Sequence, residues 1–109
     1  MSYNIIYTHE FEKEIKRLSK KYLSLKKDFK QLLKELSVSP MSGTPLGNNC
    51  YKIRLSITSK GKGKSGGARV ITYVAVIKET IVLISIYDKS EQSAITDVEI
   101  KARLRKYIK

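Results

Sequence analysis

The sequence predicts a small α+β domain in which helices pack against a mostly antiparallel sheet. Two observations carry this prediction. Apolar residues recur with helical spacing early in the chain and again at its end, whereas the middle of the chain changes to the spacing of two that is typical of strands. The 109 residues have the length of one domain, so we expect a single unit over 1–109 with the order β-α-α-β-β-β-α.

The first half of the chain predicts one strand and two helices. Tyr3–Tyr7 is short, apolar and β-prone, and Thr8 follows it as a helix N-cap. Two amphipathic patterns come next, and the second must end before Ser39-Pro40 because a proline cannot continue a helix. The two apolar faces consist of Phe11, Ile15, Leu18 and Tyr22, and of Leu25, Phe29, Leu32, Leu33 and Leu36.

The middle of the chain predicts a loop and then three strands. Met41–Asn49 contains two glycines and a proline, which is typical of a loop. Residues 51–58 alternate between apolar and polar side chains, so we expect a strand with one buried face. Ala68–Ile77 and Thr80–Tyr87 are two further strands, joined by Lys78-Glu79 as a hairpin.

The last element is predicted to be a helix. Thr96 and Glu99 have the spacing of a capping box, in which each side chain bonds the other residue's backbone. The inner face of this helix carries Ile100, Leu104, Tyr107 and Ile108.

The overall charge indicates a polyanionic partner. The chain has 22 Lys and Arg against 10 Asp and Glu, a formal charge of +12. No apolar run approaches the roughly 20 residues of a membrane-spanning helix, so no membrane partner is expected. The N-terminus lacks a secretory pattern, and the single Cys50 excludes an internal disulfide, so we expect a cytoplasmic protein.

The positive charge is concentrated in one segment. Between Leu36 and Ile77 there is no Asp or Glu, and six basic residues fall there. Such a stretch is costly through self-repulsion unless an anion relieves it, which favours a phosphate-binding face over a generic basic surface. Lys52 and Arg54 lie two residues apart on one strand and point to the same face, about 7 Å apart.

The segment Ser59–Gly67 alternates lysine with glycine. It is not a P-loop, because the required spacing and the following helix are absent. We expect Lys60, Lys62 and Lys64 to bind RNA or ribosomal phosphates; the alternative is a solvated hairpin loop. Arg69 follows this loop, and it lies near Lys52 and Arg54 if the strand that carries it pairs with theirs.

Most catalytic classes lack the residues that they need. His9 is the only histidine, metal-ligand clusters are absent, and neither a metal nor another cofactor is expected. RNA, however, supplies its own nucleophile in the 2′-hydroxyl group. Arginines can stabilise the crowded phosphate, and a lysine whose pKa is lowered by neighbouring cations can act as a base. A cluster of lysines and arginines is therefore chemically sufficient for RNA cleavage without a metal ion.

Three segments resemble the RelE/ParE superfamily of bacterial type II toxin–antitoxin systems: Cys50–Leu55, Ser59–Ile71 and Ile86–Lys89. The Lys-Gly-Lys-Gly-Lys-Ser-Gly-Gly-Ala-Arg segment most resembles the HigB-like branch. The resemblance implies a RelE-like fold and a toxin that cuts messenger RNA in the ribosomal A site, inhibiting translation. It also implies a cognate antitoxin, through which alone the toxin would meet DNA.

The resemblance also implies site residues. The family's catalytic basic residues match Lys52, Arg54, Arg69 and Lys89. The position of its base-stacking tyrosine falls near Ile95, so this sequence departs from the family pattern there. Tyr73 and Tyr87 are the candidates to replace that tyrosine in RNA binding.

Two other functions stay open at this stage. A ParE-like gyrase poison would share the fold but cut no RNA, and the basic strand face with Arg69 favours RNA cleavage over it. A non-enzymatic RNA-binding module would need aromatic residues on the polar strand faces, and few are present.

Overall fold

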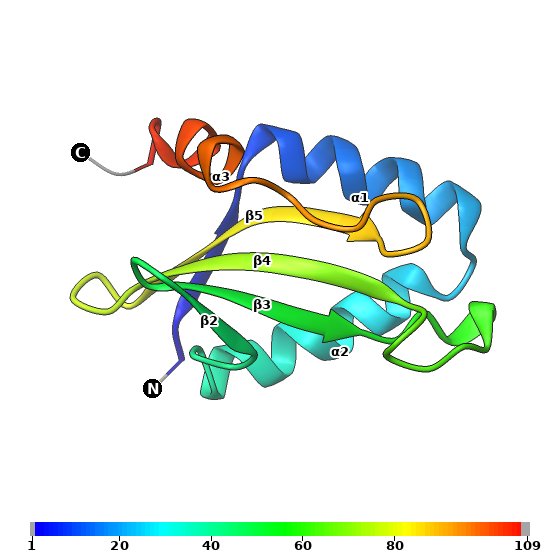
Figure 1. Cartoon of the computed structure of the whole chain (residues 1–109). Coiled ribbons are helices and arrows are strands. Elements are labelled where there is room, and N and C mark those ends of the chain that lie inside the picture. The colour runs from blue at the N-terminus through cyan, green and yellow to red at the C-terminus, as the bar shows by residue number, and fades with distance from the viewer. Residues whose placement is uncertain (1, 108–109) are drawn as a thin grey trace.

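The computed structural model describes residues 2–107, and within them three α-helices and five strands form the fold (Figure 1). The elements in chain order are β1 Asn4–Tyr7, α1 His9–Lys21, α2 Leu25–Val38, β2 Thr44–Gly47, β3 Cys50–Leu55, a short 3-10 turn Thr58–Lys60, β4 Ala68–Ala75, β5 Thr80–Asp88 and α3 Asp97–Leu104. The predicted α+β class is confirmed.

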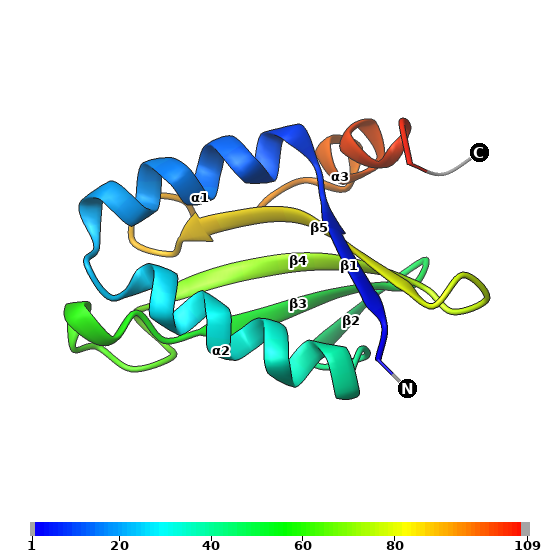
Figure 2. The ribbon, with the colours of Figure 1, turned by 180° about the vertical axis from the view of Figure 1, so that it is seen from behind.

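The strands form one sheet in the order β1-β5-β4-β3-β2. β1 runs parallel to β5, and the other neighbours are antiparallel. Figures 1 and 2 show α1 and α2 along one face of the sheet, with α3 at the other face beside β5. Because α3 is short, it does not cover the end of β3 at Leu55 or the start of β4 at Ala68 on its side of the sheet.

The main core lies between the two long helices and the sheet. The apolar faces predicted for α1 and α2 pack against inward-facing strand residues. Thr8 caps α1 as predicted, since its side chain accepts a hydrogen bond from the Phe11 backbone N–H at 3.0 Å. The buried members of this core are Phe11, Leu18, Leu25, Leu32, Leu36, Ile53, Leu55, Ile57, Ala68, Val70, Ile81, Leu83 and Ile86.

The strand β2 is the main difference from the prediction. The expectation of a loop over Met41–Asn49 is wrong at Thr44–Gly47, which pairs antiparallel with β3. All four β2 residues are exposed and one is a proline, so no alternating pattern marks this strand in the sequence. Its pairing reaches only from Cys50 to Lys52, and the remainder of β3 has a free edge.

The strand β3 is also shorter than predicted. It ends at Leu55, and the chain turns into the 3-10 segment at Thr58. The carboxylate of Asp28 on α2 accepts hydrogen bonds from the Thr58 backbone N–H at 2.9 Å and from its hydroxyl at 2.6 Å. These bonds draw the chain toward α2 and away from the sheet.

The predicted hairpin is confirmed as β4 and β5, and a bulge interrupts it. Ile71 pairs with Ser85 but Thr72 pairs with Leu83, so Ile84 is the extra residue. The Glu14 carboxylate accepts hydrogen bonds from the Ile86 N–H at 3.2 Å and from Arg103 at 3.0 Å. The bulge is thereby tied to both α1 and α3.

The last helix begins as predicted, at the Thr96 cap. The Thr96 hydroxyl oxygen accepts from the Glu99 N–H at 3.1 Å, but the Glu99 carboxylate bonds Arg103 at 3.0 Å, so only half of the capping box forms. Ile100 and Leu104 are buried against the α3 face of the sheet together with Cys50, Ile71, Val82, Ile84 and Tyr87. The predicted position of Ile108 lies outside the described residues.

Candidate functional site

A row of three residues crosses the sheet at the end that α3 leaves uncovered. Arg54 on β3 lies directly opposite Arg69 on β4, and Arg69 lies directly opposite Tyr87 on β5. Directly opposite side chains begin about 5 Å apart and share one face of the sheet. Within residues 2–107, neither arginine forms a salt bridge with a carboxylate. The structure thus joins two of the predicted site residues, as an unneutralised pair of like charges.

Arg69 is held by the lysine-glycine loop. Arg69 is buried, with only 4% of the residue exposed. The guanidinium donates hydrogen bonds to the carbonyl oxygens of Lys64 at 3.0 Å and Ala68 at 3.1 Å, with a longer 3.5 Å contact to Ser65. A guanidinium has five N–H donors, so these contacts orient it and still leave donors for an anion.

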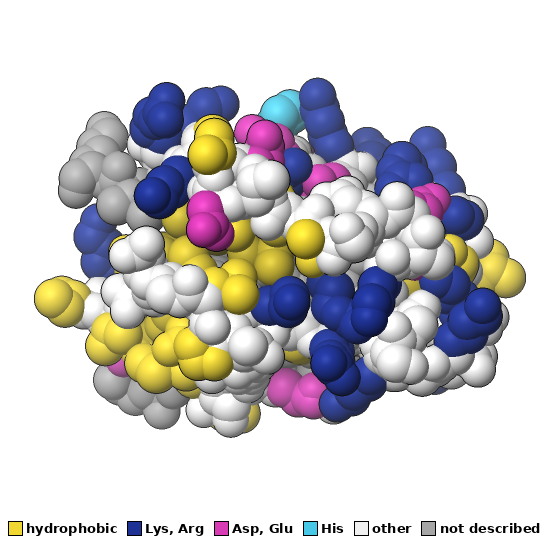
Figure 3. Space-filling model, in the orientation of Figure 1, with side chains coloured by type: hydrophobic (Ala, Val, Ile, Leu, Met, Phe, Trp, Pro, Cys, Tyr) yellow, Lys and Arg dark blue, Asp and Glu magenta, His cyan; other side chains and the backbone are white. Residues whose placement is uncertain are grey.

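Arg54 and two lysines border one hollow beside the free edge of β3. Lys52, Arg54 and Lys64 line this hollow, which has a volume of about 560 Å³. Its opposite wall comes from α2 and includes Asp28 and Glu35. Figure 3 shows Lys and Arg side chains gathered on this side of the molecule, over the end of the sheet near the loop.

The structure separates the three loop lysines into two kinds. Lys62 and Lys64 are exposed, as a docking role requires. Lys60, from which the same phosphate binding is expected, is instead paired within the protein: its Nζ lies 2.7 Å from a buried Asp88 carboxylate oxygen, and its side chain is only 12% exposed. Lys89 is exposed at the end of β5, and its backbone N–H donates to the Gly67 carbonyl at 3.1 Å.

The two candidate tyrosines lie at different ends of the sheet. Tyr87 belongs to the arginine row and is buried; burial raises the pKa of its hydroxyl, and the charge of Arg69 offsets part of that rise. Tyr73 lies four residues along β4 from Arg69, about 13 Å away. It packs against the α3-side core beside Tyr107, so the structure does not bring it to the row.

Sequence reasoning missed Asp88 and the role of Tyr22. Asp88 is fully buried and accepts hydrogen bonds from Lys60, Tyr22 and Ser90. Burial alone would raise the pKa of this carboxyl, but these hydrogen bonds together hold it well below its ordinary value. The apolar stretch of β5 ends in an acid next to Lys89, and this acid is the only sequence signal for the group.

Two features are absent from residues 2–107, a metal-binding cluster and a membrane-spanning helix. No three His, Cys, Asp or Glu side chains there gather in a way that could hold a metal ion. Within the same residues, no helix is long and apolar enough to cross a membrane.

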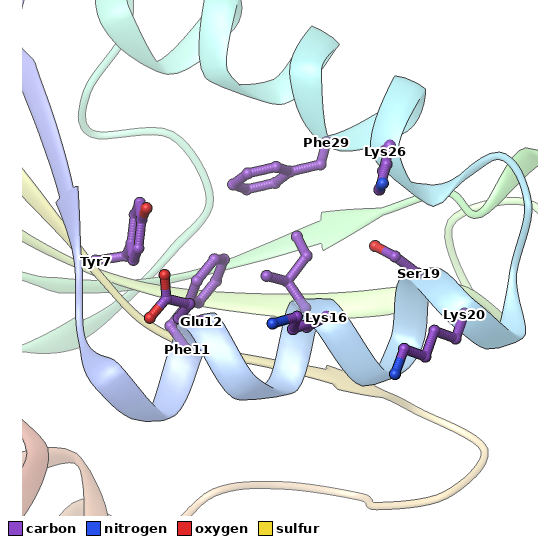
Figure 4. Close-up of a pocket in the computed structure, with 9 residues that line it drawn as sticks. Tyr7, Phe11, Glu12, Lys16, Ser19, Lys20, Lys26 and Phe29 are labelled. Atoms are coloured by element: carbon purple, nitrogen blue, oxygen red, sulfur yellow. The ribbon is translucent and has the colours of Figure 1, made fainter.

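A second hollow, shown in Figure 4, lies between α1 and α2 and has a volume of about 510 Å³. Phe11, Ile15 and Phe29 give it an apolar lining, and Lys16, Lys20 and Lys26 also border it. It lies on the face of the sheet opposite the arginine row, and so is separate from the candidate site.

The chain resembles solved toxin structures along most of its length. A mutant of E. coli toxin RelE in the free state is 23% identical, covers 100% of both chains and has a TM-score of 0.65. The toxin–antitoxin complex E. coli RelBE gives 24% identity, 80% and 96% coverage of this chain and that chain, and a TM-score of 0.63. A metal-bound toxin from Helicobacter pylori gives 18% identity, 83% and 98% coverage, and a TM-score of 0.53. These likenesses establish the fold.

The family assignment comes from a match to a family model. The model described as the RelE toxin of the RelE/RelB toxin–antitoxin system matches residues 4–108. This match confirms the resemblance drawn from the sequence, together with the expected antitoxin partner. The chain therefore belongs to the RelE family and is the toxin of a toxin–antitoxin pair.

Proposed function

We propose that this toxin cleaves messenger RNA in the ribosomal A site, with Arg54 and Arg69 stabilising the charge on the phosphate that is cut. The observation that carries the proposal is the direct opposition of these arginines on adjacent strands without a carboxylate partner. Opposed like charges are destabilising, and a bound phosphate removes their repulsion. Membership of the RelE family supports messenger RNA as the source of that phosphate.

The proposed reaction uses the substrate's own hydroxyl group as the nucleophile. The 2′-oxygen attacks the adjacent phosphorus and the bond to the 5′-oxygen breaks, which leaves a 2′,3′-cyclic phosphate and a 5′-hydroxyl end. Negative charge builds on the non-bridging oxygens, where a guanidinium can donate two hydrogen bonds at once.

In-line displacement needs a base and an acid on opposite sides of the phosphorus. Lys52 lies on the β3 side of Arg69, on the same face as Arg54, and Lys89 follows β5 on the other side. We assign Lys52 to accept the 2′-hydroxyl proton and Lys89 to protonate the leaving 5′-oxygen. A substrate with a 5′-thio leaving group needs no acid, so it should restore cleavage by Lys89→Ala but not by Lys52→Ala.

The proposed reaction is independent of a metal ion because the groups beside the scissile phosphate are cations, which repel metal ions and replace their charge. Toxin dialysed against EDTA and added to ribosomes of constant magnesium content should keep its cleavage rate. If the rate falls and returns only when a metal other than magnesium is added, this part of the proposal is contradicted.

The decisive experiment is cleavage of a defined messenger RNA on programmed ribosomes, with both product ends identified. We expect a cyclic phosphate and a 5′-hydroxyl, and we expect a single 2′-deoxy substitution at the cut site to abolish cleavage. Cutting that survives this substitution would overturn the mechanism. Absence of any cut, together with trapped gyrase–DNA complexes, would instead favour the ParE-like alternative.

A further inference from the structure

The ammonium group of Lys60 closes the lysine-glycine loop from inside. Its Nζ lies 2.9 Å from the Gly66 carbonyl oxygen, so the first and last parts of the loop meet at one charge. The same nitrogen lies 2.7 Å from Asp88 Oδ1 and 3.0 Å from Ser90 Oγ. Three acceptors match the three donors of an ammonium, so this side chain has no donor left for RNA.

Asp88 is the fixed point of this arrangement. Its side chain is fully buried, and it also accepts hydrogen bonds from the Tyr22 hydroxyl and the Ser90 N–H. The Tyr22 ring lies 5.5 Å from the Lys60 ammonium, in a cation–π contact. Tyr22 follows α1 and Asp88 ends β5. Their contacts with Lys60 therefore tie the loop to two rigid elements.

Further contacts connect Lys60 and Asp88 with Arg69. The loop carbonyls of Lys64 and Ser65 hold the Arg69 guanidinium, and the Gly67 carbonyl accepts from the Lys89 N–H. Gly67 itself packs so closely that a Cβ atom would lie 2.2 Å from the Leu55 carbonyl oxygen. The loop is therefore closed at both ends against the sheet that carries the arginine row.

We propose that Lys60 and Asp88 are a positioning pair, which sets the loop conformation that orients Arg69 toward the scissile phosphate. Replacing a buried ion pair by apolar groups is often neutral for stability, so stability alone does not explain this pair. Its location between the loop and the arginine row does. This inference rests on the proposed function only for the reaction that Arg69 serves; the orientation of Arg69 can be measured without any cleavage.

The test compares two loop variants with a matched control in the full-length toxin, and a fourth variant, Lys60→Arg, tests rescue. Lys60→Met removes the ammonium and keeps much of the stem, and Tyr22→Phe removes only the hydroxyl that supports Asp88. Lys78→Met is the matched control, because it removes one exposed lysine charge in the β4–β5 turn, at the other end of the sheet. Circular dichroism establishes that each variant is folded under the assay conditions, and Tyr22→Phe provides the test if Lys60→Met does not fold.

The first readout is structural and independent of RNA. In NMR spectra, the Arg69 side-chain N–H signals should be sharp in the wild type and in Lys78→Met, and broadened or shifted in Lys60→Met. Trypsin should cut after Lys62 or Lys64 at least tenfold faster in Lys60→Met, with a smaller increase in Tyr22→Phe. Unchanged Arg69 signals in both folded loop variants would overturn the proposal.

The second readout is the split between chemistry and binding. For Lys60→Met we expect the cleavage rate at saturating toxin to fall at least tenfold, with ribosome affinity changed less than threefold. Lys60→Arg should restore part of the rate, since a guanidinium can again donate to Asp88 and Gly66. A fall in affinity with a full saturating rate would overturn positioning in favour of a docking role. If the wild type cuts no RNA, the proposed function fails while the NMR result still decides whether the pair orients Arg69.

Discussion

Replacing Arg54 with glutamine should stabilise the free toxin while weakening its cleavage of RNA. Arg54 and Arg69 are directly opposite on β3 and β4, and neither has a carboxylate partner within residues 2–107. Removing one charge of the pair removes their repulsion. It also removes a donor that the proposed transition state needs, so stability and activity should change in opposite directions.

The size of the stabilisation follows from the spacing of the strands. Taking for the two charges the separation of about 5 Å at which directly opposite side chains begin, they repel by about 0.8 kcal/mol in bulk water and by about 3 kcal/mol at an effective dielectric constant of about 20. Arg54 is exposed, so the lower part of this range applies, and we expect about 1 kcal/mol. For a domain of this size, that corresponds to a rise in Tm of roughly 4 °C.

The assay is thermal and urea unfolding of Arg54→Gln at two salt concentrations. The stabilisation should be largest at about 0.05 M salt and fall by half or more at about 0.5 M, where charges are screened over a few ångströms. Arg105→Gln is the control, because it removes the same charge from an exposed site near the end of α3. Inorganic phosphate at constant ionic strength should raise the Tm of the wild type more than that of Arg54→Gln.

Two results would refute this reasoning. If Arg54→Gln is no more stable than Arg105→Gln at low salt, the opposed arginines do not repel one another measurably. If Arg54→Gln is more stable but cuts messenger RNA at the wild-type rate, the repulsion is real but the phosphate of the reaction binds elsewhere.

Other perturbations have equally definite expected results. Arg69→Ala and Lys52→Ala should each abolish growth inhibition, and only Arg69→Ala should also lower the free energy of unfolding, by about 1–3 kcal/mol in urea, because it leaves loop carbonyls without a donor. Changing Lys62 and Lys64 together to Gln should reduce the magnitude of the log–log salt slope of ribosome binding by roughly 1.5 to 2 in filter-binding titrations, and an unchanged slope would indicate a solvated loop. Because hydrogen bonds hold the pKa of Asp88 below its ordinary value, its contribution to stability is complete at neutral pH and is lost as the pH falls through the acidic range; Asp88→Asn should therefore flatten the acid side of a stability–pH curve, and parallel curves would contradict this. Association with the antitoxin should slow markedly in stopped-flow measurements between about 50 and 300 mM salt, given the charge of +12, whereas a salt-independent rate would argue against electrostatic steering.

The sequence by itself determined the elements that depend on local pattern. The helical spacing of apolar residues predicted α1 and α2, and the Thr8 and Thr96 caps formed as expected, because caps use only neighbouring backbone groups. Alternation predicted β3, and short apolar stretches predicted β4 and β5. The run without acids between Leu36 and Ile77 indicated where the cations would gather.

Only the tertiary structure decided which groups meet. The strand β2 exists because the edge of β3 offers it hydrogen-bond partners, and its exposed residues carry no pattern of their own. Lys60 resembles Lys62 and Lys64 in the sequence, yet it alone of the three reaches the buried Asp88, which lies 28 residues away along the chain. Strand register likewise placed Arg54 opposite Arg69. Contacts between distant segments arise from register and packing, and local sequence patterns do not encode either of them.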